Sequence, residues 1–325
     1  MIKIKTPTIF VLGAGASFDY GFPLGSELRK LIIRNFEPDY PKNLIGLFVG
    51  MGFFESDIHD FRDELIGAAT TSIDAFLEAR QPYERRLGKY AIAAALIPFE
   101  DPKKVMNQAK WLENFINTMN LELSDFKKNK WGFITFNYDR SLEYLLHTRI
   151  KSLFALSSPD AANLVNQIPI QHVYGSLGKL PWQISQHKEY LREFSTETSA
   201  PIIARSAETI DIIHDTVKDE LALKKSFLEL KNKVTRNGAS PRVFFMGFGY
   251  NEINMKRIMP SLGGSGLHGT SLGLGDRIKD YMRRTYPNVK LQDEGCEDFI
   301  TKNYKLFQAP ALSTNSYSTF PKVGG

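Results

Sequence analysis

The stretch from Thr8 to Pro23, TIFVLGAGASFDYGFP, constrains the fold more than any other part of the chain. A short apolar run, Ile9 to Leu12, leads into Gly13-Ala14-Gly15-Ala16-Ser17 with no charged residue between them. This pattern predicts a buried strand that ends in small residues and then opens a helix. Backbone N–H groups in such a turn approach a phosphate closely, and the helix N-terminus adds partial positive charge. Because Gly-x-Gly also occurs in ordinary strand-to-helix turns, a turn with no ligand remains an alternative.

The composition is that of an ordinary globular protein. The chain has 325 residues, enough for one large domain or two moderate ones, with 42% hydrophobic and 24% charged residues. Lys and Arg (41) exceed Asp and Glu (36) by 5, and the basic clusters are short, so solvated faces explain them better than a nucleic-acid groove. The single cysteine, Cys296, excludes a Cys-x-x-Cys zinc module, and no run approaches the ~20 apolar residues of a membrane span. We expect a soluble cytoplasmic protein without direct nucleic-acid or membrane contacts.

Apolar runs separated by helical patterns predict further strands and helices. The predicted strands after the first are Trp131–Phe136, Ile170–Tyr174, Arg242–Met246, a short one near residues 267–272, and Val289–Leu291. A last helix is predicted over Asp276–Thr285. Strands that alternate with helices imply a mostly parallel sheet. We therefore predict an α/β fold with a Rossmann-like sheet and helices on both faces.

The predicted sheet is interrupted by helical insertions. A nicotinamide-dependent dehydrogenase needs a second strand ending in an acidic residue about 20 positions beyond the glycine turn, and none is present. Residues 35–130 have helical spacing instead and form a predicted insertion, which residues 179–235 extend. We expect one domain over residues 1–307 and a flexible C-terminal tail over residues 308–325.

Small and amide residues follow three of the predicted strands. They are Gly13–Ser17, Asn137–Asp139 and Gly247–Gly249. Ligands of open α/β sheets bind at the carboxyl ends of the strands. These segments therefore lie where a ligand is expected.

Four segments, in this order, resemble motifs of the sirtuin superfamily. They are GAGAS…GFP at Gly13 to Pro23, TFNYD at Thr135 to Asp139, HVYGSLG at His172 to Gly178, and FFMGFGYNEIN at Phe244 to Asn254. The resemblance implies an NAD pocket built from a phosphate loop, a nicotinamide-side motif, a histidine strand end and an adenosine-side turn. Each segment follows an apolar run, and the units to which they belong make up roughly half of the chain.

The details are similar to a zinc-free bacterial branch of this superfamily that acts in anti-phage defence. Deacylase sirtuins hold zinc with four cysteines, and they continue the first motif differently from Leu24-Gly25. The segments GTSLGL at Gly269 to Leu274 and Gly295 to Phe299 also look like the defence branch. The resemblance implies an NAD glycohydrolase that releases nicotinamide and ADP-ribose in abortive infection. It further implies a homo-oligomer, a partner ATPase or a phage-derived activator, and no zinc.

One position departs from the family pattern. The histidine of the family's His-Gly pair would fall at residue 174, which is Tyr174, and the nearest histidine is His172. Residues i and i+2 of a strand share a face, so His172 and Tyr174 are expected to face one cleft. His172 then either replaces the family histidine or is a packed strand residue beside an impaired site.

Three residues are the predicted catalytic groups. Asn137 is the first choice, because an amide at a strand end can hold ribose hydroxyls or water while an oxocarbenium-like ribose forms. His172 is a candidate acceptor of a proton from a ribose hydroxyl or from the attacking water. Asp139 either binds the nicotinamide-side loop or caps the following helix.

We expect the remaining predicted site residues to contact NAD. They are Gly13, Ala14, Gly15, Ala16, Ser17, Asp19, Pro23, Tyr174, Gly175, Ser176, Gly247, Gly249 and Asn254. For Gly247, Gly249 and Asn254 a tight turn with a helix cap is an equal alternative. Asp19 either contacts ribose or organises the loop.

Two other functions are compatible with the sequence. In the first, the pocket binds NAD or ADP-ribose with weak or no catalysis and reports it to a partner ATPase or nuclease, as the Tyr174 departure suggests. In the second, the protein is a deacylase or ADP-ribosyltransferase. The missing zinc module argues against deacylation.

Overall fold

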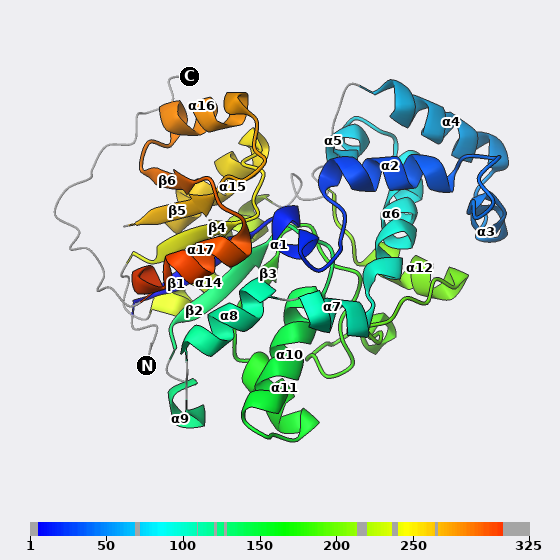
Figure 1. Cartoon of the computed structure of the whole chain (residues 1–325). Coiled ribbons are helices and arrows are strands. Elements are labelled where there is room, and N and C mark those ends of the chain that lie inside the picture. Colours follow the sequence, from blue (N-terminus) through cyan, green and yellow to red (C-terminus); the bar gives the residue numbers. More distant parts are fainter. Residues whose placement is uncertain are drawn as a thin grey trace.

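Six parallel strands form one sheet in the order β3-β2-β1-β4-β5-β6 (Figure 1). The strands are β1 (Thr8–Leu12), β2 (Trp131–Thr135), β3 (Ile170–His172), β4 (Arg242–Met246), β5 (Leu267–Thr270) and β6 (Val289–Gln292). The computed structural model describes residues 6–68, 72–108, 110–119, 122–126, 129–212, 220–235, 240–263 and 266–307. The predicted tail, residues 308–325, lies outside them. The predicted Rossmann-like α/β fold is confirmed, and the strand order reverses between β1 and β4, as in doubly wound dinucleotide-binding sheets.

The helices connect and cover these strands. Those before β2 are α1 (Ala14–Phe18), α2 (Gly25–Asn35), α3 (Ile45–Gly50), α4 (Glu55–Gly67), α5 (Ile73–Glu78), α6 (Pro82–Leu96), α7 (Pro102–Gln108), α8 (Lys110–Met119) and α9 (Leu123–Phe126). Those after it are α10 (Ser141–Leu153), α11 (Ser158–Val165), α12 (Ala200–Glu208), α14 (Glu220–Thr235), α15 (Glu252–Leu262), α16 (Asp276–Thr285) and α17 (Cys296–Lys302). Short 3₁₀ turns are η1 (Ile97–Phe99), η2 (Lys188–Tyr190) and η3 (Tyr304–Phe307).

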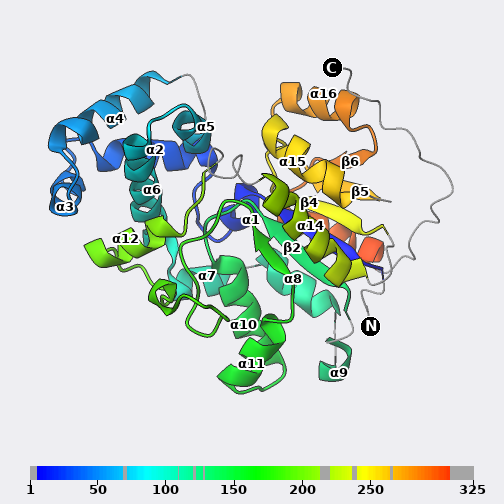
Figure 2. The ribbon, with the colours of Figure 1, turned by 180° about the vertical axis from the view of Figure 1, so that it is seen from behind.

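Both faces of the sheet are covered. Helices α8 and α17 lie over one face (Figure 1), and α14 and α15 over the other (Figure 2). Every residue of β1, β2 and β4 is buried, which is why these strands read as continuous apolar runs rather than alternating ones.

A row of aromatic rings fills the core on the α8 side. Phe10 of β1 is paired in register with Phe133 of β2 and Phe244 of β4, and its ring stacks on theirs at 5.3 and 5.6 Å. Phe115 of α8 packs edge-on against Phe10 at 4.9 Å. Ring pairs of this kind contribute ~0.5–1.5 kcal/mol beyond the area that they bury. The row therefore holds the three central strands in one register.

A group of helices lies beyond the carboxyl ends of the strands (Figure 1). Helices α2, α4, α5 and α6 pack on one another, and α12 packs against α6. The second predicted insertion, residues 179–235, is divided in the structure. Residues 179–199 hold no helix longer than η2, α12 joins the helical group, and α14 covers the sheet.

A buried arginine connects the helical group to the rest of the protein. Arg140, just before α10, is fully buried and forms a bidentate ion pair with the buried carboxylate of Glu100, with Nε donating to Oε1 at 2.9 Å. Its Nη1 and Nη2 atoms also donate to the backbone carbonyls of Lys179 (3.2 Å), Arg192 (2.8 Å) and Glu193 (3.0 Å). One guanidinium thereby joins the end of η1, the start of α10 and the loop after β3.

Within the described part of the chain, no helix combines the length and apolar character needed to cross a membrane.

We expect Glu100→Gln to destabilise the protein strongly. The substitution leaves the buried Arg140 guanidinium without its counter-charge, and breaking a buried pair in this way costs about 3–5 kcal/mol. Urea unfolding followed by circular dichroism measures the change. Glu252→Gln is the matched control, because Glu252 pairs with Lys256 at the surface, where such pairs contribute about 0.2–1 kcal/mol. Equal losses in the two variants would contradict the assigned role of Arg140.

Candidate functional site

The turns after β1 and β4 touch at the point where the strand order reverses. Gly13 N donates to Met246 O (3.1 Å), and Gly15 N donates to Gly247 O (2.9 Å). Gly247 has φ +56°, and a Cβ on it would lie 2.1 Å from Ala16 N. A Cβ on Gly13 or Gly15 would lie within 2.8 Å of the β4 turn. The glycines are therefore required for backbone-to-backbone contact between the two turns.

This contact changes the interpretation of the glycine turn. The N–H groups of Gly13 and Gly15 donate to the β4 turn, and Ala16 N donates to Gly13 O at 2.9 Å. Three N–H groups that the sequence predicted for a diphosphate are thus engaged within the protein. Ala14 and Gly15 are half-buried at this edge of the sheet. The close approach favours the ordinary-turn alternative for these backbone groups, although the turn still lies where ligands of such sheets bind.

Asn137 lies directly beside the glycine turn. Its Nδ2 donates to Gly13 O (2.9 Å) and to Ser17 Oγ (3.0 Å). Because a carbonyl oxygen only accepts, the atom that faces Gly13 is the nitrogen. The Oδ1 atom accepts no hydrogen bond from the described residues, and the side chain is half-buried. Asn137 therefore presents an oriented acceptor at the carboxyl end of β2.

Asp139 is buried at the start of α10. Its Oδ1 accepts from the backbone N of Ser141 (3.1 Å) and from the Ser141 hydroxyl. Burial raises the pKa of Asp139, and hydrogen bonds from the hydroxyls of Ser141 and Ser17 oppose the rise. This geometry fits the capping alternative for Asp139, and Ser17 links it to Asn137.

Both ring nitrogens of His172 are engaged. Nδ1 lies 2.9 Å from Asn137 O, and Nε2 lies 2.8 Å from Glu143 Oε1. Since both partners are acceptors when Glu143 is ionised, the ring donates from both nitrogens. The pair is buried, with side-chain exposures of 8% for His172 and 3% for Glu143. His172 therefore holds the backbone of Asn137 and has no nitrogen free to accept a substrate proton in this arrangement.

Glu143 is a site residue that sequence reasoning missed. Burial raises its pKa, but the charge and hydrogen bond of His172 outweigh burial, and the net pKa is lowered. The sequence shows Glu143 within an apolar helical stretch beside Leu142 and Leu146, and nothing local indicates that it reaches a histidine 29 residues later.

Strand β3 ends at His172 and is therefore two residues shorter than predicted. Tyr174 lies in the turn that follows it. The alternation of a strand therefore does not extend to Tyr174. Its hydroxyl donates to Asn254 Oδ1 (2.5 Å) and accepts from Arg257 Nη1 (2.8 Å), both on α15. Burial raises the pKa of Tyr174 to about 12, although Arg257 opposes the rise. The structure thus brings the predicted residues Tyr174 and Asn254 together. Their hydrogen bonds do not involve Asn137 and Glu143, the partners of His172.

The turn that follows packs on the end of α12. Gly175 has φ +66°, and a Cβ on it would lie 2.0 Å from Thr209 O. Ser176 N donates to Thr209 O (3.0 Å), and Ser176 Oγ donates to Gly178 O (2.9 Å). Together with His172, Gly175 and Ser176 border a hollow of about 280 Å³. Gly175 and Ser176 therefore fix the path of the backbone next to the site through their contacts with Thr209.

The other predicted NAD-binding residues are more peripheral. Asp19 is exposed, and its pKa is raised by partial burial and by repulsion from Glu297. Pro23 lines a separate apolar hollow beside α2. A Cβ on Gly249 would have no described neighbour within 4 Å. The structure does not bring these residues into contact with Asn137.

The helical group contributes an acidic residue that the sequence did not reveal. Asp74, at the start of α5, accepts a short hydrogen bond from the hydroxyl of Tyr138, the residue after Asn137. Tyr138 also donates to Asp211 O at 3.3 Å. Burial raises the pKa of Asp74 despite the hydrogen bond from Tyr138. The only sequence signal is Ser72-x-Asp74, which predicts a helix start and gives no information on a partner 64 residues away.

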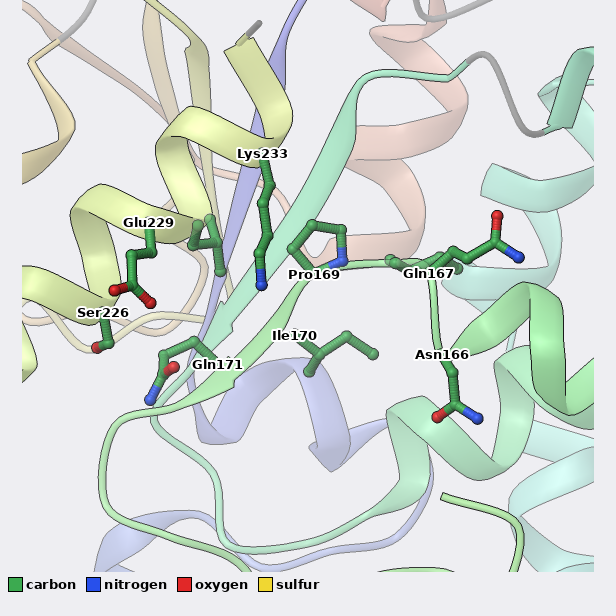
Figure 3. Close-up of a pocket in the computed structure, with 10 residues that line it drawn as sticks. Asn166, Gln167, Pro169, Ile170, Gln171, Ser226, Glu229 and Lys233 are labelled. Carbon is green, nitrogen blue, oxygen red and sulfur yellow. The ribbon is translucent and has the colours of Figure 1, made fainter. Parts of the chain in front are cut away.

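A larger hollow of about 400 Å³ lies at the amino end of β3 (Figure 3). Amide and charged side chains surround it, among them Gln167, Gln171, Glu229 and Lys233. None of the predicted site residues lines it, and strand β3 points away from it toward the predicted site.

No family model matches this chain, and no curated protein matches it significantly. Among the residues that the structure describes, no group of three or more His, Cys, Asp and Glu side chains is arranged to hold a metal ion.

We expect Gly247→Ala to destabilise the protein by more than about 2 kcal/mol. A non-glycine residue in the left-handed region costs roughly 1–2 kcal/mol, and the new Cβ also collides with the Ala16 backbone. Thermal unfolding measures the loss. Gly249→Ala, two residues later and in open space, serves as the control and should change stability by less than about 0.5 kcal/mol. A tolerated Gly247→Ala would show that the two turns do not touch as described.

The His172–Glu143 pair should make stability depend on acid pH. A carboxyl group with a lowered pKa stabilises the fold above its unfolded-state pKa near 4.5, and this contribution disappears as pH falls through the folded-state pKa. Wild type should therefore be more stable than Glu143→Gln at pH 6, and the difference should shrink below about pH 4.5. Urea unfolding at several pH values measures it. A difference that is constant with pH would rule out the ion pair.

Proposed function

We propose that this protein hydrolyses the glycosidic bond between nicotinamide and ribose in NAD. Water and NAD would give nicotinamide, ADP-ribose and a proton. The oriented amide oxygen of Asn137 carries this assignment. It is half-buried, accepts no hydrogen bond from the described residues, and lies at the carboxyl end of β2 beside the reversal of strand order. Dinucleotides bind at this place in doubly wound sheets.

Cleavage of this glycosidic bond does not require a general acid. Nicotinamide leaves NAD as a neutral ring from a cationic one, so its departure needs no proton. The demanding step is to stabilise an oxocarbenium-like ribose and to position water. The Asn137 amide would accept a hydrogen bond from a ribose hydroxyl or from that water. Because Gly13 and Ser17 fix its orientation in advance, little reorganisation is needed during the reaction.

His172 is assigned a positioning role in this proposal. Its Nδ1–H group holds the Asn137 carbonyl, and Glu143 holds the other side of the ring. The hydroxyl of Ser17 accepts a hydrogen bond from the Asn137 amide and donates one to Asp139, so these two residues help to orient the same amide. The resemblance to sirtuin-like defence proteins further suggests that the activity is controlled by oligomerisation, a partner ATPase or a phage-derived activator.

A second function is favoured by two specific observations. The N–H groups of Gly13 and Gly15 already bond to the β4 turn, and both nitrogens of His172 are engaged. A pocket built in this way would bind NAD or ADP-ribose and transmit its occupancy to a partner without turnover.

We expect purified protein, in its native assembly, to release nicotinamide from NAD. Asn137→Ala should lower kcat at least about 10²-fold, comparable to the removal of one oriented polar group from a catalytic site. His172→Ala should lower kcat less, because it displaces Asn137 rather than removing its amide. Chromatography of nicotinamide and ADP-ribose measures both.

Asn163→Ala is the matched control, because Asn163 is an exposed amide on α11 and should leave kcat unchanged. Undiminished release by Asn137→Ala would refute the site. Tight binding of NAD by calorimetry, with no release by wild type, would favour the binding function instead.

A further inference from the structure

An open apolar hollow of about 500 Å³ lies between the end of α1 and the side of α2. Its apolar lining comes from Phe18, Phe22, Pro23, Leu31 and Phe99. Phe18 is 48% exposed, although it is a large aromatic side chain, and the rings of Phe22 and Phe99 lie 6.0 Å apart. At protein interfaces, large apolar side chains of one partner fill apolar hollows of the other, so this hollow can receive such a side chain.

Three cations surround this hollow. Lys30 and Arg34 stand one turn apart on α2 and line it, and Lys104 of α7 extends across Gly21 with its ammonium group 5.9 Å from the Phe99 ring. None of the three forms an ion pair with a carboxylate of the described residues. Glu27 also lines the hollow and adds one negative charge, so the surroundings keep a net positive charge that favours an acidic partner.

The arrangement suits spaced carboxylates better than a phosphate group. A phosphate site needs donors that converge on one point, commonly at a helix N-terminus. Here the carboxylate of Glu27 already occupies the first turn of α2 and accepts from Leu24 N at 2.9 Å. The cations are spread along α2 and α7 instead, and the Arg34 guanidinium lies over the Tyr40 ring at 5.2 Å. The chain's own residues 308–325 contain no Asp or Glu, so they lack the complementary charge.

We propose that the hollow docks an acidic segment of a partner protein, with one large apolar side chain in the hollow and flanking carboxylates on Lys30, Arg34 and Lys104. This assignment does not depend on the proposed NAD hydrolysis. The apolar side chain supplies most of the affinity, and the carboxylates set orientation and association rate.

The test uses the full chain and a synthetic probe, the peptide acetyl-Glu-Asp-Glu-Leu-Trp-Glu-Asp-Glu-amide, in calorimetric titrations at low salt. We expect a dissociation constant below about 100 µM that weakens with added salt. The double variant Lys30→Glu, Arg34→Glu should weaken binding at least about tenfold. A peptide with Ala-Ala in place of Leu-Trp should bind at least about tenfold more weakly.

The matched control is Arg277→Glu with Lys188→Glu, which changes net charge equally on exposed positions of α16 and η2, and should leave binding within about twofold. Thermal unfolding verifies that both double variants are folded. Absence of binding up to about 1 mM peptide overturns the proposal, and so does a dissociation constant that the α2 substitutions leave unchanged. Competition by NAD, together with weaker NAD binding in the α2 variant, also overturns it and assigns the hollow to a nucleotide.

Discussion

The contact between the turns after β1 and β4 is the constraint on which the candidate site depends. Strands β1 and β4 are neighbours at the centre of the sheet, and their turns can approach only because Gly13, Gly15 and Gly247 carry no side chain. Once the turns touch, Gly13 O faces outward as an acceptor, and the amide of Asn137 bonds to it. The glycine motif thus builds the site indirectly. The Gly13 carbonyl orients the candidate amide of Asn137, whereas the N–H groups of Gly13 and Gly15 form hydrogen bonds within the protein.

Around Asn137 the polar groups form two separate sets. Ser17 and Asp139 support the side chain of Asn137, while His172 and Glu143 hold its backbone. On the other side, Tyr174 bonds to Asn254 and Arg257 on α15. The ring of Phe136 lies between the sets, 5.7 Å from Tyr174 and 5.0 Å from Phe248. A ligand at the carboxyl ends of β2 and β4 would lie near the half-buried side chains of Asn137 and Phe136.

Local patterns predicted the elements whose sequences are dictated by burial. Strand β4 has the predicted bounds, and β1 and β2 differ from prediction by one residue, because buried parallel strands must be continuously apolar. Helix α16 also has the predicted bounds, although Met282 is its one buried residue. Strand β3 ends two residues early, since the chain turns at Gly175 to pack on α12. Among the predicted site residues, the structure brings Ser17, Asn137, Asp139 and His172 together at the carboxyl ends of β1, β2 and β3. Asp74 and Glu143 were missed because their roles come from contacts across long stretches of chain, which no local spacing encodes.

The Arg140 guanidinium has a consequence for how the protein is organised as a folding unit. Its hydrogen bonds and ion pair reach residues 39 to 53 positions away, on both sides along the chain, so the helical group, α10 and the loop after β3 share one buried charge. A helical insertion attached only at its ends can unfold, or be gained and lost in evolution, without harm to its host domain. Here removal of the insertion would leave a cation in the interior with no anion. We therefore expect the insertion and the sheet to unfold together as one cooperative unit.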